Sequence, residues 1–223
     1  MGCICVKESI LPQEEAITLM ESQLEYFKNS CIQVDYTMRK YSYLSVINPT
    51  QWTDICDNLE LKTENNLISP KVESLYASLQ LQDGCFKLRP LLVMGIFLSN
   101  GMSRQKARLL FEVYDEKKTD SLEKPEISEL LDLIKDIVVD KLPILVHNST
   151  NPPSSSQNVA RYSKKISKAY SVGKGKLIDM IFGDQGTVGV KDFSLLFDNQ
   201  ENGRILTPYG FRMFLGQFAE EEE

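Results

Sequence analysis

The chain has 223 residues, a hydrophobic fraction of 42% and a formal net charge of −6 at pH 7. This length is enough for one large domain or two small lobes, and the acidic balance argues against nucleic acid as the main partner. Five cysteines without regular spacing and a single histidine predict no disulfide framework, zinc site or histidine-based triad. The sequence contains no run of about 18 apolar residues, so we expect no helix that spans a membrane. We therefore expect a protein of a reducing compartment that is not an enzyme.

The sequence begins MGCICVKES, with a glycine and two cysteines in its first five residues. Gly2 becomes terminal once methionine is removed and is the residue that N-myristoylation requires, although Val6 departs from the usual Ser or Thr. One acyl chain binds membranes only marginally, so palmitoylation of Cys3 and Cys5 would supply a second signal. We expect residues 1–10 to be an acylated anchor, which makes the protein cytoplasmic and peripheral at the cytoplasmic leaflet. The alternative is a terminus whose glycine and cysteines have no such role.

Next along the chain, residues 11–65 are expected to form N-terminal helices. Pro12 and the acidic residues after it are typical of a first helical turn. Apolar residues then recur at helical spacing as far as about Asn29. They are Ile17, Met20, Leu24 and Phe27.

From residue 69 onward, apolar helical segments alternate with polar loops. Helices are predicted at 69–79, 89–99, 104–114, 125–142, 160–182 and 206–218. Residues 147–159, rich in Ser, Asn and Pro, are expected to be a disordered insertion. Thr207 is expected to cap the last helix, with Pro208 as its first residue.

Three segments match the twelve-residue frame of a calcium-binding loop, in which ligands occupy positions 1, 3, 5, 7 and 12 and glycine occupies position 6. An apolar residue at position 8 pairs with the partner loop. The three frames are 79–90 (Gly84 at 6, Phe86 at 8), 115–126 (Asp115 at 1, Leu122 at 8, Glu126 at 12) and 181–192 (Gly186 at 6, Val188 at 8, Asp192 at 12).

The segment SNGMSRQKARLLFEVYDEKKTDSLEKPEISELL, residues 99–131, resembles the EF-hand family that includes neuronal calcium sensors and the calcineurin B subunit. The resemblance covers roughly residues 65–218. It implies an all-α fold of helix–loop–helix pairs in two lobes, with short paired strands in the loops. One EF-hand pair region would occupy 66–142, and an EF-hand-like region with a closing helix would occupy 160–218. Residues 30–65 would hide a degenerate first hand.

The loop residues limit calcium binding to at most one site. The frame 79–90 has leucine at positions 1 and 3 and Pro90 at position 12, and 181–192 has Ile181 at position 1. Only the frame 115–126 has a carboxylate at both position 1 and position 12. Its candidate Ca²⁺ ligands are Asp115, Thr119, Ser121 and Glu126. Lys117 replaces the ligand at position 3, so we expect affinity weaker than the roughly 10⁻⁷ to 10⁻⁵ M of sensor sites.

A second register is possible near the C-terminus. The segment 198–209 places Asp198, Gln200 and Asn202 at positions 1, 3 and 5 and Gly203 at position 6. Tyr209 at position 12 provides no bidentate carboxylate. We prefer 181–192 as the paired loop and interpret 198–209 as a turn before the closing helix.

Two hypotheses for function follow. The first is a membrane-tethered calcium sensor whose apolar segments, 91–98 and 211–218, form a groove for a helix of a target protein. The second is a calcium-independent scaffold that keeps the EF-hand frame for packing and protein binding. A basic stretch without acidic residues either contacts anionic lipid or is a solvated helix face. It contains Arg161, Lys164, Lys165, Lys168, Lys174 and Lys176.

Overall fold

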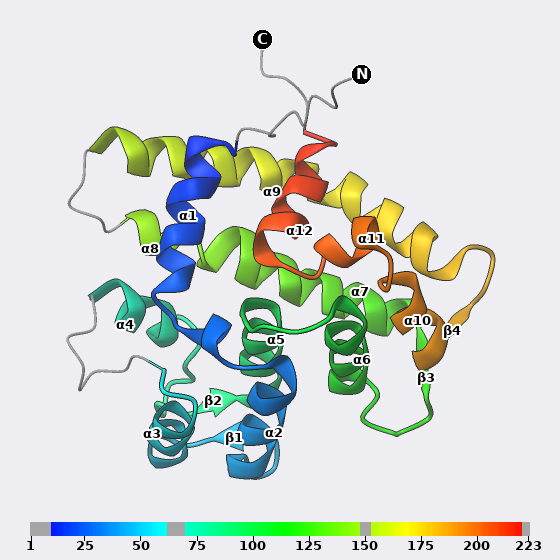
Figure 1. Cartoon of the computed structure of the whole chain (residues 1–223), viewed down its shortest axis with the longest axis horizontal. Helices are drawn as coiled ribbons and strands as arrows, with labels where there is room; N and C mark the ends of the chain where they lie inside the picture. Colours follow the sequence, from blue (N-terminus) through cyan, green and yellow to red (C-terminus); the bar gives the residue numbers. More distant parts are fainter. Residues whose placement is uncertain (1–9, 62–69, 148–152, 220–223) are drawn as a thin grey trace, which may run out of the picture.

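The structure is a computed structural model that describes residues 10–61, 70–147 and 153–219. The described chain is predominantly helical, which confirms the predicted all-α class (Figure 1). The first half contains α1 (Pro12–Ser22), a 3₁₀ turn η1 (Tyr26–Lys28), α2 (Cys31–Tyr41), β1 (Val46–Ile47), α3 (Pro49–Asn58), α4 (Pro70–Ala77), β2 (Phe86–Lys87), α5 (Leu88–Leu98) and α6 (Ser103–Tyr114). The second half contains β3 (Ser121–Glu123), α7 (Lys124–Lys135), a π-helical turn η3 (Asp136–Lys141), α8 (Ile144–His147), α9 (Pro153–Phe182), β4 (Thr187–Gly189), α10 (Val190–Leu196), α11 (Gln200–Arg204) and α12 (Pro208–Gly216).

The strands form two antiparallel pairs, and each strand lies between two helices. β1 pairs with β2, which places Ile47 opposite Phe86. β3 pairs with β4, which places Leu122 opposite Val188. All four of these side chains are buried. Each strand pair therefore joins two helix–strand–helix units through a few backbone hydrogen bonds and two apolar side chains.

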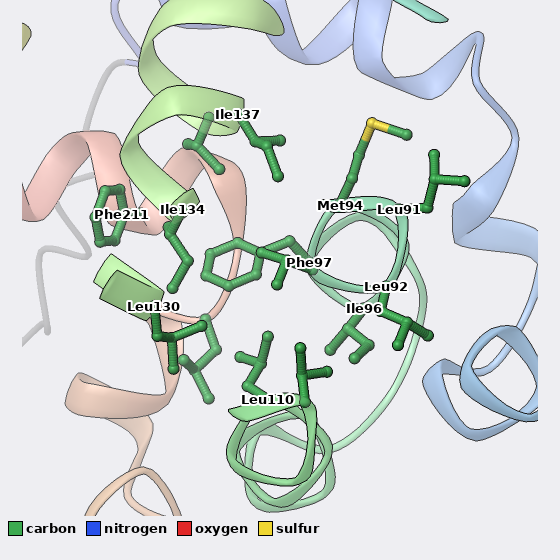
Figure 2. Packing of buried hydrophobic residues seen from close by; sticks show 14 of the residues in the cluster. Leu91, Leu92, Met94, Ile96, Phe97, Leu110, Leu130, Ile134, Ile137 and Phe211 are labelled. Atoms are coloured by element: carbon green, nitrogen blue, oxygen red, sulfur yellow. The ribbon is translucent and has the colours of Figure 1, made fainter. Parts of the chain in front are cut away.

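A continuous hydrophobic core connects both halves of the described chain. Figure 2 shows Phe97 of α5 among apolar side chains of α6, α7 and α12. The rings of Phe97 and Phe211 meet edge to face with centroids 6.3 Å apart, a geometry that adds about 0.5–1.5 kcal/mol beyond area burial. On the other side of α5, Gly95 allows α2 to approach closely, because a Cβ there would lie 2.6 Å from Cγ1 of Val34.

The predicted apolar face of residues 125–142 is confirmed. Its six apolar residues are all buried: Ile127, Leu130, Leu131, Ile134, Ile137 and Val138. α7 ends at Lys135, and the chain continues without a break into the π-helical turn η3.

The first helix is shorter than the sequence predicts. α1 ends at Ser22, and Glu25 adopts a left-handed conformation with φ 63°. This residue redirects the chain into η1. Ile17, Met20 and Leu24 are buried as expected, but Phe27 is 51% exposed, so its assignment to the same apolar face was wrong.

The predicted insertion at 147–159 is also wrong in part. Residues 148–152 lie outside the described residues, but α9 begins at Pro153 and runs for 30 residues. Proline suits the first turn of a helix, where its missing N–H has no partner to lose. Val159 is buried in the core and fixes the early part of α9. Within the described residues, no helix combines the length and the apolar composition needed to cross a membrane.

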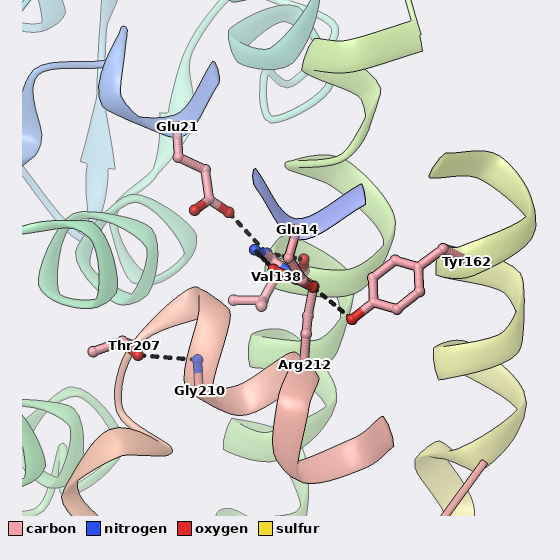
Figure 3. A network of polar contacts seen from close by, with 7 residues as sticks. All are labelled: Glu14, Glu21, Val138, Tyr162, Thr207, Gly210 and Arg212. Atoms are coloured by element: carbon pink, nitrogen blue, oxygen red, sulfur yellow. Dashed lines mark hydrogen bonds and ion pairs between the residues drawn. The ribbon is translucent and has the colours of Figure 1, made fainter. Parts of the chain in front are cut away.

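A buried ion-pair network joins the first and last helices (Figure 3). Arg212 of α12 and Glu14 of α1 are both fully buried. The Arg212 guanidinium donates from Nε and Nη2 to the two carboxylate oxygens of Glu14, each at 2.8 Å. Its Nη1 donates to Glu21 Oε1 at 2.8 Å and to the carbonyl of Val138 at 3.2 Å. One guanidinium therefore binds two carboxylates and the turn that follows α7.

A fourth helix also contributes to this network. The hydroxyl of Tyr162, on α9, donates to Glu14 Oε1 at 2.6 Å. Burial and the neighbouring Glu14 carboxylate raise the pKa of Tyr162, so its hydroxyl keeps the proton that it donates. The carboxylates in turn raise the pKa of Arg212 despite its burial. The network therefore fixes α1, η3, α9 and α12 relative to one another.

Replacing Arg212 should be strongly destabilising, because Arg212→Met leaves two buried carboxylates without a cation. We expect the free energy of unfolding in urea to fall by about 3–5 kcal/mol. The triple variant Arg212→Met/Glu14→Gln/Glu21→Gln should be clearly more stable than the single variant. Arg108→Met, which breaks an exposed pair with Glu112, should cost less than about 1 kcal/mol. Equal losses for Arg212→Met and Arg108→Met would contradict this account.

Candidate functional site

The loop after α6 is closed by its own hydrogen bonds. Asp115 ends α6, and its Oδ1 accepts from the backbone N–H of Thr119 at 2.8 Å and from the Thr119 hydroxyl at 3.1 Å. Its Oδ2 accepts from the backbone N–H of Asp120 at 2.8 Å. The Thr119 hydroxyl also lies 2.9 Å from the carbonyl of Ser121. Three of the four candidate ligand residues therefore bond to one another or to the loop backbone.

The backbone of this loop follows the predicted turn. Asp120, which stands where a glycine is usual, has φ 53°, so it takes the left-handed conformation that the position requires. Lys118 has the same φ, and both residues are exposed. Slight desolvation by itself would raise the pKa of Asp115. Hydrogen bonds from the backbone N–H groups of Thr119 and Asp120 outweigh this effect and hold the pKa below its ordinary value. The Asp115 carboxylate therefore holds the loop closed through hydrogen bonds to its backbone.

The fourth candidate ligand, Glu126, caps a helix. Its Oε2 accepts from the backbone N–H of Glu123 at 2.8 Å and completes a capping box at the start of α7. The same contact occurs after β1, where Oε1 of Gln51 accepts from the backbone N–H of Asn48 at 2.8 Å. Ile47 and Leu122 are each buried opposite an apolar residue of the partner strand. Gln51 follows Ile47 by four residues, just as Glu126 follows Leu122, so Gln51 and Glu126 occupy equivalent positions. A neutral amide makes the contact in one unit and a carboxylate makes it in the other.

These residues do not fit a calcium ion well. Both oxygens of Asp115 already accept hydrogen bonds, and Lys117 and Lys118 place two cations in the loop. Within residues 10–61, 70–147 and 153–219, no three His, Cys, Asp or Glu side chains meet in a group that could hold a metal ion. The oxygen atoms that lie close enough to share an ion are the hydroxyl of Thr119, the carbonyl of Ser121 and one carboxylate. Calcium takes six to eight oxygen ligands, so this set is too small.

The segment 30–65 was left open by the sequence, and its described part, residues 30–61, contains a helix–strand–helix unit. α2 and α3 flank β1, and Leu44 and Ser45 in the turn have φ 49° and 61°. Asn48 caps α3 through its side chain, which accepts from the backbone N–H of Gln51 at 2.9 Å. The pattern Asn-Pro-x-Gln at 48–51 was a visible capping signal in the sequence.

The last loop differs in its turn. α9 continues to Phe182 and ends at Gly183, which has φ 51° and donates its N–H to the carbonyl of Asp179 at 2.8 Å. Gly186, the glycine expected at the sharp turn, has a negative φ. Because the helix reaches two residues into the expected frame, Gly183 makes the turn as a helix C-cap. Asp192 is exposed on the first turn of α10.

The segment 198–209 contains no strand and consists of a short helix and a cap. α11 begins after Asn199, whose side chain accepts from the backbone N–H of Asn202 at 2.8 Å. Thr207 caps α12 as predicted, and its hydroxyl accepts from the N–H of Gly210 at 3.1 Å. The strand that pairs with β3 comes from 187–189 instead.

Of the two apolar segments proposed for a target groove, 91–98 is almost entirely buried, whereas 211–218 buries Phe211, Arg212 and Leu215 and leaves its other residues half-buried or exposed. The remaining cavity between α5, α6, α7 and α12 has a volume of about 20 Å³, which is the room of a single water molecule. Its lining is apolar and includes Phe97, Leu110 and Phe211. The interior of the described chain therefore has no open groove at this place. The lipidation candidates Gly2, Cys3 and Cys5 lie outside the described residues.

A buried lysine of α6 contacts the C-terminal end of α5. Lys106 is 4% exposed, and its Nζ donates to the carbonyl of Phe97 at 2.9 Å. Burial lowers the pKa of Lys106 to about 8, although the nearby Cys31 thiol opposes the shift. Burial raises the pKa of Cys31 in turn. This ammonium therefore interacts with carbonyl dipoles at the C-terminal end of a helix, where a cation is favoured.

Sequence reasoning missed Arg212 and Lys106 because their partners are distant in the sequence or are backbone carbonyls. Arg212 and Glu14 are 198 residues apart, and no local pattern links them. Comparisons of the chain with protein-family models, curated proteins and solved structures find no match. The functional proposals below therefore rest on the sequence and the geometry of this chain.

The shifted pKa of Lys106 should appear in the pH dependence of stability. Unfolded Lys106 keeps its proton up to about its ordinary pKa of 10.5, whereas the folded residue loses it above about 8. The unfolded state binds more protons in this window, so stability rises with pH there. Relative to Lys106→Met, the wild type should gain on the order of 2 kcal/mol between pH 8 and pH 10 in urea unfolding. Parallel pH profiles for the two proteins would contradict the buried charge.

Proposed function

We propose that this chain is a calcium-independent scaffold of EF-hand type that is tethered to a membrane by its N-terminus. The two antiparallel strand pairs support the EF-hand frame. Leu122 and Val188, the two residues assigned to position 8, lie opposite one another. Phe86, assigned to position 8 of an earlier loop, lies opposite Ile47 in the unit that the sequence left open. In this proposal the four units form two lobes of paired hands.

The observation that carries the proposal is the shared helix cap. Gln51 and Glu126 make the same hydrogen bond at 2.8 Å to a backbone N–H three residues earlier. The contact needs an acceptor oxygen but no charge, because an amide oxygen makes it equally well. Position 12 of these loops thus stabilises the next helix and is not reserved for a metal ion.

The second candidate is a weak calcium sensor with one site at 115–126. The observation that favours it is the presence of carboxylates at both ends of this loop, Asp115 and Glu126. Calcium would have to break the cap of α7 and compete with the hydrogen bonds to Asp115. In that case Thr119 and Ser121 would supply a hydroxyl and a carbonyl oxygen.

A scaffold also needs a surface for a protein partner. Large exposed apolar side chains lie around the starts of α2 and α6. Backbone hydrogen bonds hold these two segments side by side, from Cys31 to Asn100 and from Asn100 to Asn29. The exposed side chains are Phe27, Ile32, Tyr36 and Met102. Since the segment 91–98 and the side chains of Phe211 and Leu215 are buried, this surface is where a helix of a target protein would find apolar contacts without unfolding the core.

Calcium should leave the stability and the heat signal of the protein unchanged. A ligand that binds only the folded state raises the melting temperature by mass action, so we expect no shift in millimolar calcium and no saturable heat on titration. Glu126→Gln should keep the cap and match the wild type, whereas Glu126→Ala should lose about 1 kcal/mol of stability. Saturable heat in the wild type that disappears in Glu126→Gln would overturn the scaffold and support the sensor.

The tether makes a separate prediction about the N-terminus. The full chain, produced in cells that carry N-myristoyl and palmitoyl transferases, should have a myristoylated Gly2 and thioester-linked acyl groups on Cys3 or Cys5. Mass spectrometry of the N-terminal peptide measures both modifications, and hydroxylamine removes only the thioesters. Gly2→Ala should abolish myristoylation. An unmodified wild-type peptide would remove the tether from the proposal while leaving the scaffold intact.

A further inference from the structure

The helix α9 presents one face on which basic residues gather. Between Pro153 and Ile178 the sequence contains no Asp or Glu, although the whole chain has a net charge of −6. The structure divides the six cations of this stretch into two groups. Lys174 faces inward and donates to Asp132 at 2.7 Å. The exposed group is Arg161, Lys164, Lys168 and Lys176, with Lys165 half-buried beside them.

The exposed cations form a flat stripe. At about 100° per residue, the five cations lie within a sector of about 120°, and Lys174 lies on the other side of the helix. Val172, an apolar residue that is 55% exposed, lies in the middle of this sector. With a rise of about 1.5 Å per residue, the stripe from Arg161 to Lys176 is about 23 Å long. Its shape suits an extended planar partner better than a small ligand.

The position of α9 suits a surface near the N-terminus. Figure 1 shows α9 along one edge of the molecule, with α2, α3 and the β1–β2 sheet at the opposite edge. Tyr162, next to Arg161, donates to Glu14 in the first turns of α1. The nine residues from Gly2 to Ile10 span at most about 32 Å when fully extended. Acyl chains on the N-terminal segment could thus insert into the same bilayer that the basic stripe contacts.

We propose that the basic face of α9, formed by Arg161, Lys164, Lys165, Lys168 and Lys176 with Val172 at its centre, binds the surface of an anionic lipid bilayer. The charge of the face is complementary to such a surface, and each basic residue close to it strengthens binding roughly fivefold. Val172 adds an apolar contact. The inference deepens the proposed tether by naming the face that meets the membrane, but its test does not need the acyl chains.

The test uses the full-length chain without acylation and vesicles of phosphatidylcholine, with and without about one-third phosphatidylserine. Co-sedimentation should show binding to the anionic vesicles alone. Binding should disappear near 1 M salt, where the Debye length falls to about 3 Å. The variant Arg161→Gln/Lys164→Gln/Lys176→Gln should bind on the order of a hundredfold more weakly. The matched control Lys40→Gln/Lys87→Gln/Lys117→Gln removes the same charge from exposed residues and should bind like the wild type.

Circular dichroism of both variants should match the wild type, because every substituted residue is exposed. Equal losses in the two variants, or no binding to anionic vesicles, would overturn the proposal. Binding to double-stranded DNA or to polyglutamate without binding to vesicles would also overturn it, in favour of an acidic macromolecule as the partner. These outcomes are distinct from a failure of the tether, which is measured by the modification of Gly2, and from a failure of the scaffold, which is measured by calcium.

Discussion

The arrangement of the outer helices depends on the buried ion pairs of the Arg212 guanidinium with Glu14 and Glu21. The guanidinium is fully buried together with Glu14, and it pairs with the carboxylates of both Glu14 and Glu21. Removing these charges from water costs several kcal/mol each, and only complete pairing recovers that cost. The pairing is complete only when α1, η3 and α12 are all in place. Because α9 contributes Tyr162 to the same carboxylate, the network also fixes the helix that presents the basic face.

The strand pairs impose a much weaker requirement on the sequence. Leu122 and Val188 need only to be apolar and in register, and the ladder hydrogen bonds come from the backbone. Nothing in this pairing depends on the residues at the ligand positions. The fold can therefore be kept while ligands are replaced, provided that each loop is closed by other means. Here Asp115 closes one loop by accepting backbone N–H groups, and Gln51 and Glu126 cap the helices that follow.

The sequence predicted what depends on local periodicity and missed what depends on distant partners or single backbone angles. The apolar face of α7 and the cap at Thr207 follow from side chains a few residues apart, and both are confirmed. The exposure of Phe27 follows from the left-handed conformation of Glu25, a residue type that seldom adopts it. The early start of α9 depends on core contacts of Val159 that outweigh a polar composition. The structure brings Asp115, Thr119 and Ser121 together and uses Glu126 to cap α7, and these hydrogen bonds could not be predicted without the turn geometry.

The distribution of charge connects the packing to the proposed function. Two cations that point toward the protein are paired with carboxylates: Arg212 with Glu14, and Lys174 with Asp132. The buried Lys106 instead donates to the backbone carbonyl of Phe97. α9 uses its inward side for packing, and Arg161, Lys164, Lys168 and Lys176 are exposed on one face. A helix whose inner contacts are satisfied in this way is rigid, and a rigid face loses little conformational entropy when it binds a planar surface. In this chain the loops that resemble metal sites thus stabilise the fold, and the surface that we propose for the bilayer is the outside of a helix that the buried network holds in place.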